Sequence, residues 1–181
     1  MRKSIIVKGP ALSRSGYGEQ TRYAIRALRS REDLFDVYIL NIPWGSTGHL
    51  TEQTEETKFL RECIVKTQQH IQSKLGFDMS LQVTIPNEFE KIAPVNIGYT
   101  AGIETTKVAP QWIDKCNAMV DKVIVVSEHS RKVFENTTYQ IQDNAGNTLP
   151  NWGVSVPVQS IAYATRDLEA ESLDLEFTTT K

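Results

Sequence analysis

Two glycines, Gly16 and Gly18, follow a short apolar run and open an amphipathic helical pattern in the stretch "GPALSRSGYGEQTRYAIRAL". A helix that begins in a glycine-rich loop after a strand directs unpaired N–H groups and its positive dipole end toward the mouth of the sheet. Glycine also lets a ligand approach the backbone closely. The pattern therefore predicts either a site for an anion such as a diphosphate, with Ser15 beside it, or a glycine turn that holds no ligand.

Polar and aromatic side chains follow the other apolar runs. Ligands of an open α/β sheet bind beyond the carboxyl ends of its strands, so residues that follow strands are the candidates for contact with a second substrate. The candidates for an acceptor site are Trp44, His49, Glu88, Glu104, Thr105, Glu128 and His129. Each also has a structural interpretation: a tryptophan can cover the core, and glutamates or histidines can cap helices or lie in solvent. The sequence identifies no catalytic residue.

Apolar runs of strand length alternate with helical patterns and must position these residues. Short, nearly continuous Val/Ile runs are typical of parallel strands that are covered on both faces. The runs occupy residues 4–7, 35–40, 80–85, 95–101, 122–127 and 156–164. Helices are predicted near 54–75, from Ala109 with Pro110 in the first turn, and after Ser127 as N-cap. We therefore predict an α/β, Rossmann-like open sheet, mostly parallel, with helices on both faces.

The length of 181 residues predicts one domain, over 1–164, followed by an acidic tail or the start of an interdomain linker over 165–181. One segment interrupts the α/β alternation: residues 139–153 place Asp143, Asn144 and Gly146 between two β-prone pieces. Such a cluster of turn residues predicts a hairpin or a surface excursion.

Composition and charge argue against several classes of function. A formal net charge of −2 gives no reason to expect nucleic acid or an anionic membrane as partner. Cys63 and Cys116 show no metal-ligand spacing, so we expect buried or idle thiols in a reducing compartment and no metal site. The amino-terminal apolar run is too short for a signal peptide and no later run approaches a membrane span, which predicts a cytoplasmic protein.

The stretch "GYGEQT" differs from the GxGxxG dinucleotide fingerprint only in its third glycine. Two features count against a dinucleotide site. The residues "PALSRS" separate the strand from the first glycine, and Asn41, not an acid, ends the second strand. A P-loop is excluded because no Gly-Lys-Ser/Thr follows the loop. A dinucleotide-binding oxidoreductase domain stays open as an alternative.

The glycine loop and a second block, "VNIGYTAGIETTKVAPQWIDKCNAMVDKVIVVSEHSRKVF" (95–134), resemble the amino-terminal, acceptor-side domain of a GT-B glycosyltransferase of the family 4-like type. Similar enzymes show an extended loop with a glycine pair, a Glu-Thr pair, a Pro-x-Trp helix and a strand ending in Ser-Glu. The final "VPVQSIAYATRD" looks like the strand that precedes their interdomain linker. The resemblance implies that residues 1–164 form the GT-B amino-terminal domain and that Gly16 and Gly18 contact the donor diphosphate.

By the same resemblance, the donor is a nucleotide sugar that binds as substrate, not as a tightly held cofactor, and the acceptor is unknown. The reaction would retain anomeric configuration and would not strictly need a metal. In that family the basic residues that grip the donor and a Glu-x7-Glu motif lie in a carboxy-terminal Rossmann-like domain. This sequence contains no such domain, so we expect the chain to be inactive without one.

A non-catalytic carbohydrate-binding or assembly module is a further alternative. A domain separated from its partner exposes an apolar cleft face, so we also expect a homo-oligomer to form through that face.

Overall fold

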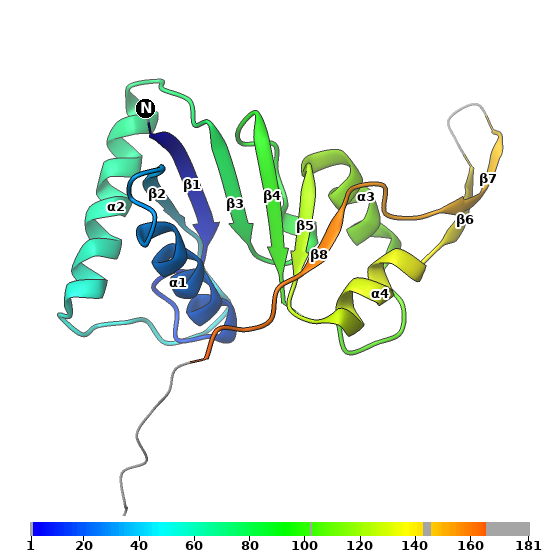
Figure 1. Cartoon of the computed structure of the whole chain (residues 1–181), viewed down its shortest axis with the longest axis horizontal. Coiled ribbons are helices and arrows are strands. Elements are labelled where there is room, and N and C mark those ends of the chain that lie inside the picture. Colours follow the sequence, from blue (N-terminus) through cyan, green and yellow to red (C-terminus); the bar gives the residue numbers. More distant parts are fainter. Residues whose placement is uncertain (1, 102, 143–145, 166–181) are drawn as a thin grey trace, which may run out of the picture.

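The computed structural model describes residues 2–101, 103–142 and 146–165, which form an open sheet flanked by helices (Figure 1). All neighbouring strands of the six-stranded sheet pair in parallel, in the order β2-β1-β3-β4-β5-β8. The strands are β1 (Lys3–Gly9), β2 (Phe35–Asn41), β3 (Met79–Val83), β4 (Val95–Thr100), β5 (Lys122–Val125) and β8 (Val158–Ser160). The predicted Rossmann-like α/β fold class is confirmed.

Helix α1 (Gly16–Arg29) packs on one face of the sheet. Its Ile25 is buried against Ile5 and Val7 of β1, which point to the same face because they are two residues apart. Leu81 and Val83 of β3 belong to the same apolar cluster. The burial of this cluster fixes α1 over β1 and β3, with its first turn at the carboxyl edge of the sheet (Figure 1).

Helix α2 (Glu55–Gln72) lies against β2, the first edge strand of the sheet. The buried Thr67 hydroxyl accepts a hydrogen bond of 2.7 Å from the backbone N–H of Ile39. The edge of β2 thus has a side-chain acceptor where a further strand would otherwise pair. Leu60 and Cys63 bury the same side of α2 in the core cluster that contains Ile25.

The opposite face of the sheet is covered by the segment after β3, which includes the short 3-10 helix η1 (Pro86–Glu88), and by α3 (Pro110–Met119). The buried ring of Phe89 lies on Gly98 of β4, where a Cβ atom would overlap the ring. Cys116 of α3 is buried with Val123 of β5, and burial raises the pKa of its thiol to about 12. Both cysteines are free and buried, as predicted.

Helix α4 (Glu128–Asn136) begins at the predicted N-cap: the Ser127 hydroxyl accepts a 3.0 Å hydrogen bond from the Ser130 N–H. The predicted hairpin is also present, as the antiparallel pair β6 (Tyr139–Gln142) and β7 (Thr148–Trp152). Its predicted turn residues Asp143 and Asn144 lie outside the described residues, as does the predicted tail from 166 onward.

The two faces of β4 and β5 differ in how they are covered. Val123 and Val125 are buried beneath α3 and α4, whereas Tyr99 and Ile124, which point to the α1 side, are partly exposed. Among the described residues, α1 and α2 are the helices that pack on this side, and they lie over β1, β2 and β3. None of the helices in the described part of the chain has the length and apolar character that a membrane crossing requires.

Candidate functional site

The parallel sheet brings the predicted site residues to one edge, because each follows the carboxyl end of a strand. The direction in which strands are added reverses between β1 and β3. From β1 the chain continues to β2 on one side, and from β3 it continues to β4 on the other side. In open α/β sheets this switch point is where the loops diverge and leave room for a ligand. The loop after β1 and the start of α1 form one side of the switch point in this protein.

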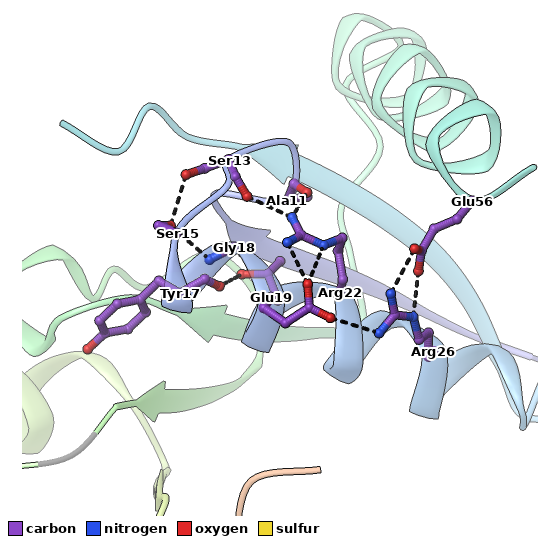
Figure 2. Close-up of polar contacts among 10 residues, drawn as sticks. Ala11, Ser13, Ser15, Tyr17, Gly18, Glu19, Arg22, Arg26 and Glu56 are labelled. Carbon is purple, nitrogen blue, oxygen red and sulfur yellow. Dashed lines mark hydrogen bonds and ion pairs between the residues drawn. The ribbon is translucent and has the colours of Figure 1, made fainter. Parts of the chain in front are cut away.

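Ser15 is the N-cap residue of α1. Its hydroxyl accepts a 3.1 Å hydrogen bond from the N–H of Gly18 and a 2.9 Å hydrogen bond from the Ser13 hydroxyl. The Ser13 hydroxyl also lies 2.7 Å from the Thr47 hydroxyl, in the loop after β2. Ser15 therefore has a structural role in helix initiation (Figure 2). Through Ser13, its hydroxyl belongs to a small network that connects the loop after β1 with the loop after β2.

The two predicted phosphate-binding glycines have different surroundings. A Cβ atom on Gly18 would overlap the backbone oxygen of Ser13, so internal packing alone requires glycine there. A Cβ atom on Gly16 would meet no heavy atom within 4 Å, and Gly16 is exposed. Packing thus accounts for Gly18, whereas no neighbour requires glycine at position 16.

The loop after β1 is anchored by Arg22, a residue that the sequence did not single out. Arg22 is 5% exposed, and its guanidinium group donates 2.8 Å hydrogen bonds to the carbonyl oxygens of Ala11 and Ser13. The same group forms a 2.7 Å ion pair with Glu19 (Figure 2). A buried charge of this kind needs hydrogen-bonding partners on all sides, and the loop backbone supplies them. Arg22 therefore fixes the loop conformation from within.

Glu19 extends this network along α1. One carboxylate oxygen accepts from Arg22 and the other from Arg26 at 3.2 Å, while Arg26 pairs with Glu56 of α2 (Figure 2). Partial burial acts to raise the pKa of Glu19, but the hydrogen bonds from Arg22 and Arg26 bring it below its ordinary value. The guanidinium groups of Arg22 and Arg26 therefore form ion pairs with Glu19 and Glu56 and are not directed at the sheet edge.

Tyr17, in the first turn of α1, crosses toward β4. Its hydroxyl lies 3.1 Å from that of Thr100 and accepts a 3.0 Å hydrogen bond from the N–H of Ala101. Burial raises the pKa of this phenol, and the nearby charge of Glu88 adds to the effect. The ring packs on Trp44, with ring centroids 4.4 Å apart. Trp44 was predicted either to contact an acceptor or to cover the core. The observed contact with Tyr17 supports the second interpretation.

His49 and Glu88 have different surroundings. His49 is exposed, and its backbone forms an isolated bridge with Ser13. The Glu88 carboxylate accepts a 3.1 Å hydrogen bond from Thr84, while its backbone oxygen accepts from the buried Lys8. Both residues follow the carboxyl end of a strand, His49 after β2 and Glu88 after β3, as predicted.

A second group of predicted residues gathers near the starts of α3 and α4. Glu104 and Thr105 line a cavity of about 380 Å³ together with Trp112. The His129 imidazole lies 3.3 Å from the carbonyl oxygen of Thr105, so these two predicted residues are in contact. This cavity has carboxylate, hydroxyl and aromatic groups on its wall, which are the groups that a hydroxylated ligand would meet.

Glu128 does not join that cavity. Its carboxylate forms an ion pair of 2.8 Å with Arg131 and accepts a hydrogen bond from Ser160 at the end of β8. The hydrogen bond from Arg131 holds the pKa of Glu128 below its usual range. Glu128 therefore connects α4 to the last strand, a contact that its helix-start position did not predict.

No group of three or more His, Cys, Asp or Glu side chains within residues 2–101, 103–142 and 146–165 is placed to hold a metal ion. No family profile, curated protein or solved structure matches this chain.

Proposed function

We propose that this chain is the amino-terminal, acceptor-side half of a glycosyltransferase that moves a sugar from a nucleotide-sugar donor to an acceptor hydroxyl. The proposal is supported by the resemblance of residues 9–28 and 95–134 to that family. The observation that carries it is the exposed amide end of α1 at Gly16, beside the switch point of a parallel sheet.

The start of α1 suits a diphosphate for a physical reason. The N–H groups of Gly16 and Tyr17 have no intrahelical acceptor, and the helix dipole adds roughly half a positive charge at this end. Position 16 carries no side chain that would cover these groups. The same contacts would stabilise the charge that develops on a leaving diphosphate when the bond to the sugar breaks.

The cavity between Glu104, Thr105 and Trp112 is the proposed acceptor site. A carboxylate and a hydroxyl there would orient the acceptor hydroxyls, and the indole would offer an apolar face. The His129 imidazole lies against the carbonyl oxygen of Thr105, one of the lining residues. In this arrangement the chain supplies positioning, and transfer requires the carboxy-terminal domain that the resemblance implies. We therefore expect this chain alone to bind ligands without turnover.

The dinucleotide alternative has less support. The strand order places one strand beyond β1, whereas the usual dinucleotide-binding order, 3-2-1-4-5-6, places two there. Asn41 stands where that fold has an acid for the ribose hydroxyls, and its side-chain oxygen already accepts a 3.0 Å hydrogen bond from the N–H of Leu12. Asn41 is thus committed to the loop after β1.

Calorimetric titration with UDP-glucose, GDP-mannose and NADH tests the proposal. The wild-type chain should bind a nucleotide sugar, and Gly16→Asp should abolish binding because it places a negative charge at the amide end of α1. Gly76→Asp is the matched control, since Gly76 is equally open but precedes β3 at the opposite edge. Equal affinity of both variants would contradict the proposal.

The other two functions have their own signatures in the same titration. Saturable NADH binding would favour the oxidoreductase domain. With free glucose added as a fourth ligand, binding of the sugar with no response to any nucleotide would favour the non-catalytic carbohydrate-binding module.

A further inference from the structure

A groove runs along α1 over β3, β4 and β5, on the face of the sheet that α1 shares with α2. Its volume is about 300 Å³. One wall is α1 from Gln20 to Leu28, the floor is formed by Leu81, Tyr99 and Ile124, and the other wall is residues 161–164. Most of the lining is apolar or aromatic, and the size lies at the lower end of the range of small-molecule sites.

Gln20 is the exception in this lining. The residue is 3% exposed, and neither the nitrogen nor the oxygen of its side-chain amide has a hydrogen-bond partner in the described part of the chain. Burial raises the pKa of Tyr99, and the nearby Gln20 amide partly offsets that rise. The two groups are therefore neighbours, but they fall short of a well-formed hydrogen bond.

An unpartnered amide is unfavourable in an apolar wall, because it has lost its hydrogen bonds to water and gained none in return. Leucine would fill a similar volume at position 20 and would suit the helix equally well. The presence of glutamine in this place is explained if a ligand completes its hydrogen bonds.

The chemistry of the groove narrows the class of ligand. A primary amide presents a donor and an acceptor side by side, which matches a ring edge that carries an adjacent donor and acceptor. Glutamine forms such a bidentate pair with the edge of adenine. Tyr23, Tyr99 and Tyr163 line the same groove, and tyrosine rings provide surfaces on which planar bases stack. We propose that this groove binds a planar heteroaromatic ring of the nucleobase type, with the Gln20 amide hydrogen-bonded to the ring edge.

This site is separate from the amide end of α1. Gln20 lies one helical turn beyond Gly16, which is a rise of about 6 Å. The nucleobase proposal rests on Gln20 and the groove, and it holds whether or not a diphosphate binds at Gly16.

The test is an NMR titration of the ¹⁵N-labelled chain with adenine, uracil, benzene and inorganic pyrophosphate, each added separately. The Gln20 side-chain amide is assigned by its absence from the spectrum of Gln20→Leu. Adenine or uracil should shift this resonance saturably, and the affinity of Gln20→Leu for that base should fall about tenfold or more. Gln68→Leu, an exposed position on α2, should bind the base like the wild type. Benzene, which lacks the donor and acceptor, should bind wild type no better than Gln20→Leu.

Several results would overturn the nucleobase site. One is that neither base shifts the Gln20 resonance saturably. Another is that wild type and Gln20→Leu bind the base with equal affinity. A third is that the Gln20 resonance moves only with protein concentration, which would indicate that a second copy of the chain covers the groove. A Gln20→Leu chain that melts below the wild type by circular dichroism would show that the amide has a structural partner, and it too would contradict the proposal. Pyrophosphate should leave the Gln20 amide unchanged, so failure at Gly16 and failure in the groove are distinguishable.

Discussion

Helix α1 has two sides that use their polar groups in opposite ways. On one side, Gly18 and Arg22 are explained entirely by the protein's own structure, through close packing on Ser13 and hydrogen bonds to the loop carbonyls. On the other side, Gly16 meets no neighbour and the Gln20 amide has no partner among the described residues. The difference separates residues that build the loop from residues that are available to a ligand.

The two glycines should show the largest contrast. Gly18→Ala should destabilise the chain by about 3 kcal/mol, because the added methyl group would overlap backbone that cannot move aside easily. Gly16→Ala should stabilise it by about 0.5–1 kcal/mol, since the position is open and alanine restricts the unfolded chain. Urea unfolding of both variants measures this contrast. Similar free energies of unfolding for the two variants would remove the distinction between the sides.

Removal of the buried guanidinium should be the next largest effect. Arg22→Met keeps most of the apolar stem but leaves the carbonyl oxygens of Ala11 and Ser13 without their donor, so we expect a loss of about 2–3 kcal/mol in the free energy of unfolding. Arg61→Met, at an exposed position on α2, is the control and should change stability by less than about 0.5 kcal/mol. An unchanged free energy of unfolding in Arg22→Met would mean that the loop conformation does not depend on the Arg22 hydrogen bonds.

Substitution of Gln20 should change the free energy of unfolding in the opposite direction from substitution of Arg22, although both are buried polar residues of the same helix. Gln20→Leu should raise the free energy of unfolding by about 1–2 kcal/mol, because it replaces an unpaired amide with an apolar group of similar volume. Thermal and urea unfolding without ligand measure the change. A destabilised Gln20→Leu would place Gln20 on the structural side of α1.

The loss of stability at acid pH should distinguish the two sides further, although the expected change in the free energy of unfolding is smaller. Because the pKa of Glu19 is lower in the folded chain than its ordinary 4.5, its ion pairs stabilise the fold above that pH and are lost as the pH falls through the folded value. Glu19→Gln should therefore weaken the dependence of unfolding free energy on pH between about 3 and 5. The exposed Glu32→Gln should leave that dependence close to wild type. An unaltered loss of stability at acid pH in Glu19→Gln would show that the network of Figure 2 contributes little.

Much of the fold was predictable because the signals are local. The Val/Ile runs of β1 and β5, the Ser127 cap and the turn residues of the hairpin each act within a few neighbours in sequence. The parallel arrangement then brings the predicted site residues to one edge without further information.

The sequence could not predict which site residues form internal contacts and which are available to a ligand, because these contacts join residues that are distant in sequence. Ser15 meets Thr47 through Ser13, Glu128 meets Ser160, and Tyr17 reaches Thr100 only after the sheet has formed. Arg22 and Gln20 looked like ordinary polar residues of an amphipathic helix. The spacing of Gln20 four residues after Gly16, on the same helix face, is the one signal that could have pointed to it.

The most direct test of the two-sided account of α1 is the set of backbone amide shifts during titration of the wild-type chain with a nucleotide sugar. We expect saturable shifts at Gly16 and Tyr17, with Gly18 and the hairpin residue Gly146 nearly unmoved. Shifts at Gly18 that equal those at Gly16, or no saturable shift at Gly16 with any nucleotide sugar, would contradict it.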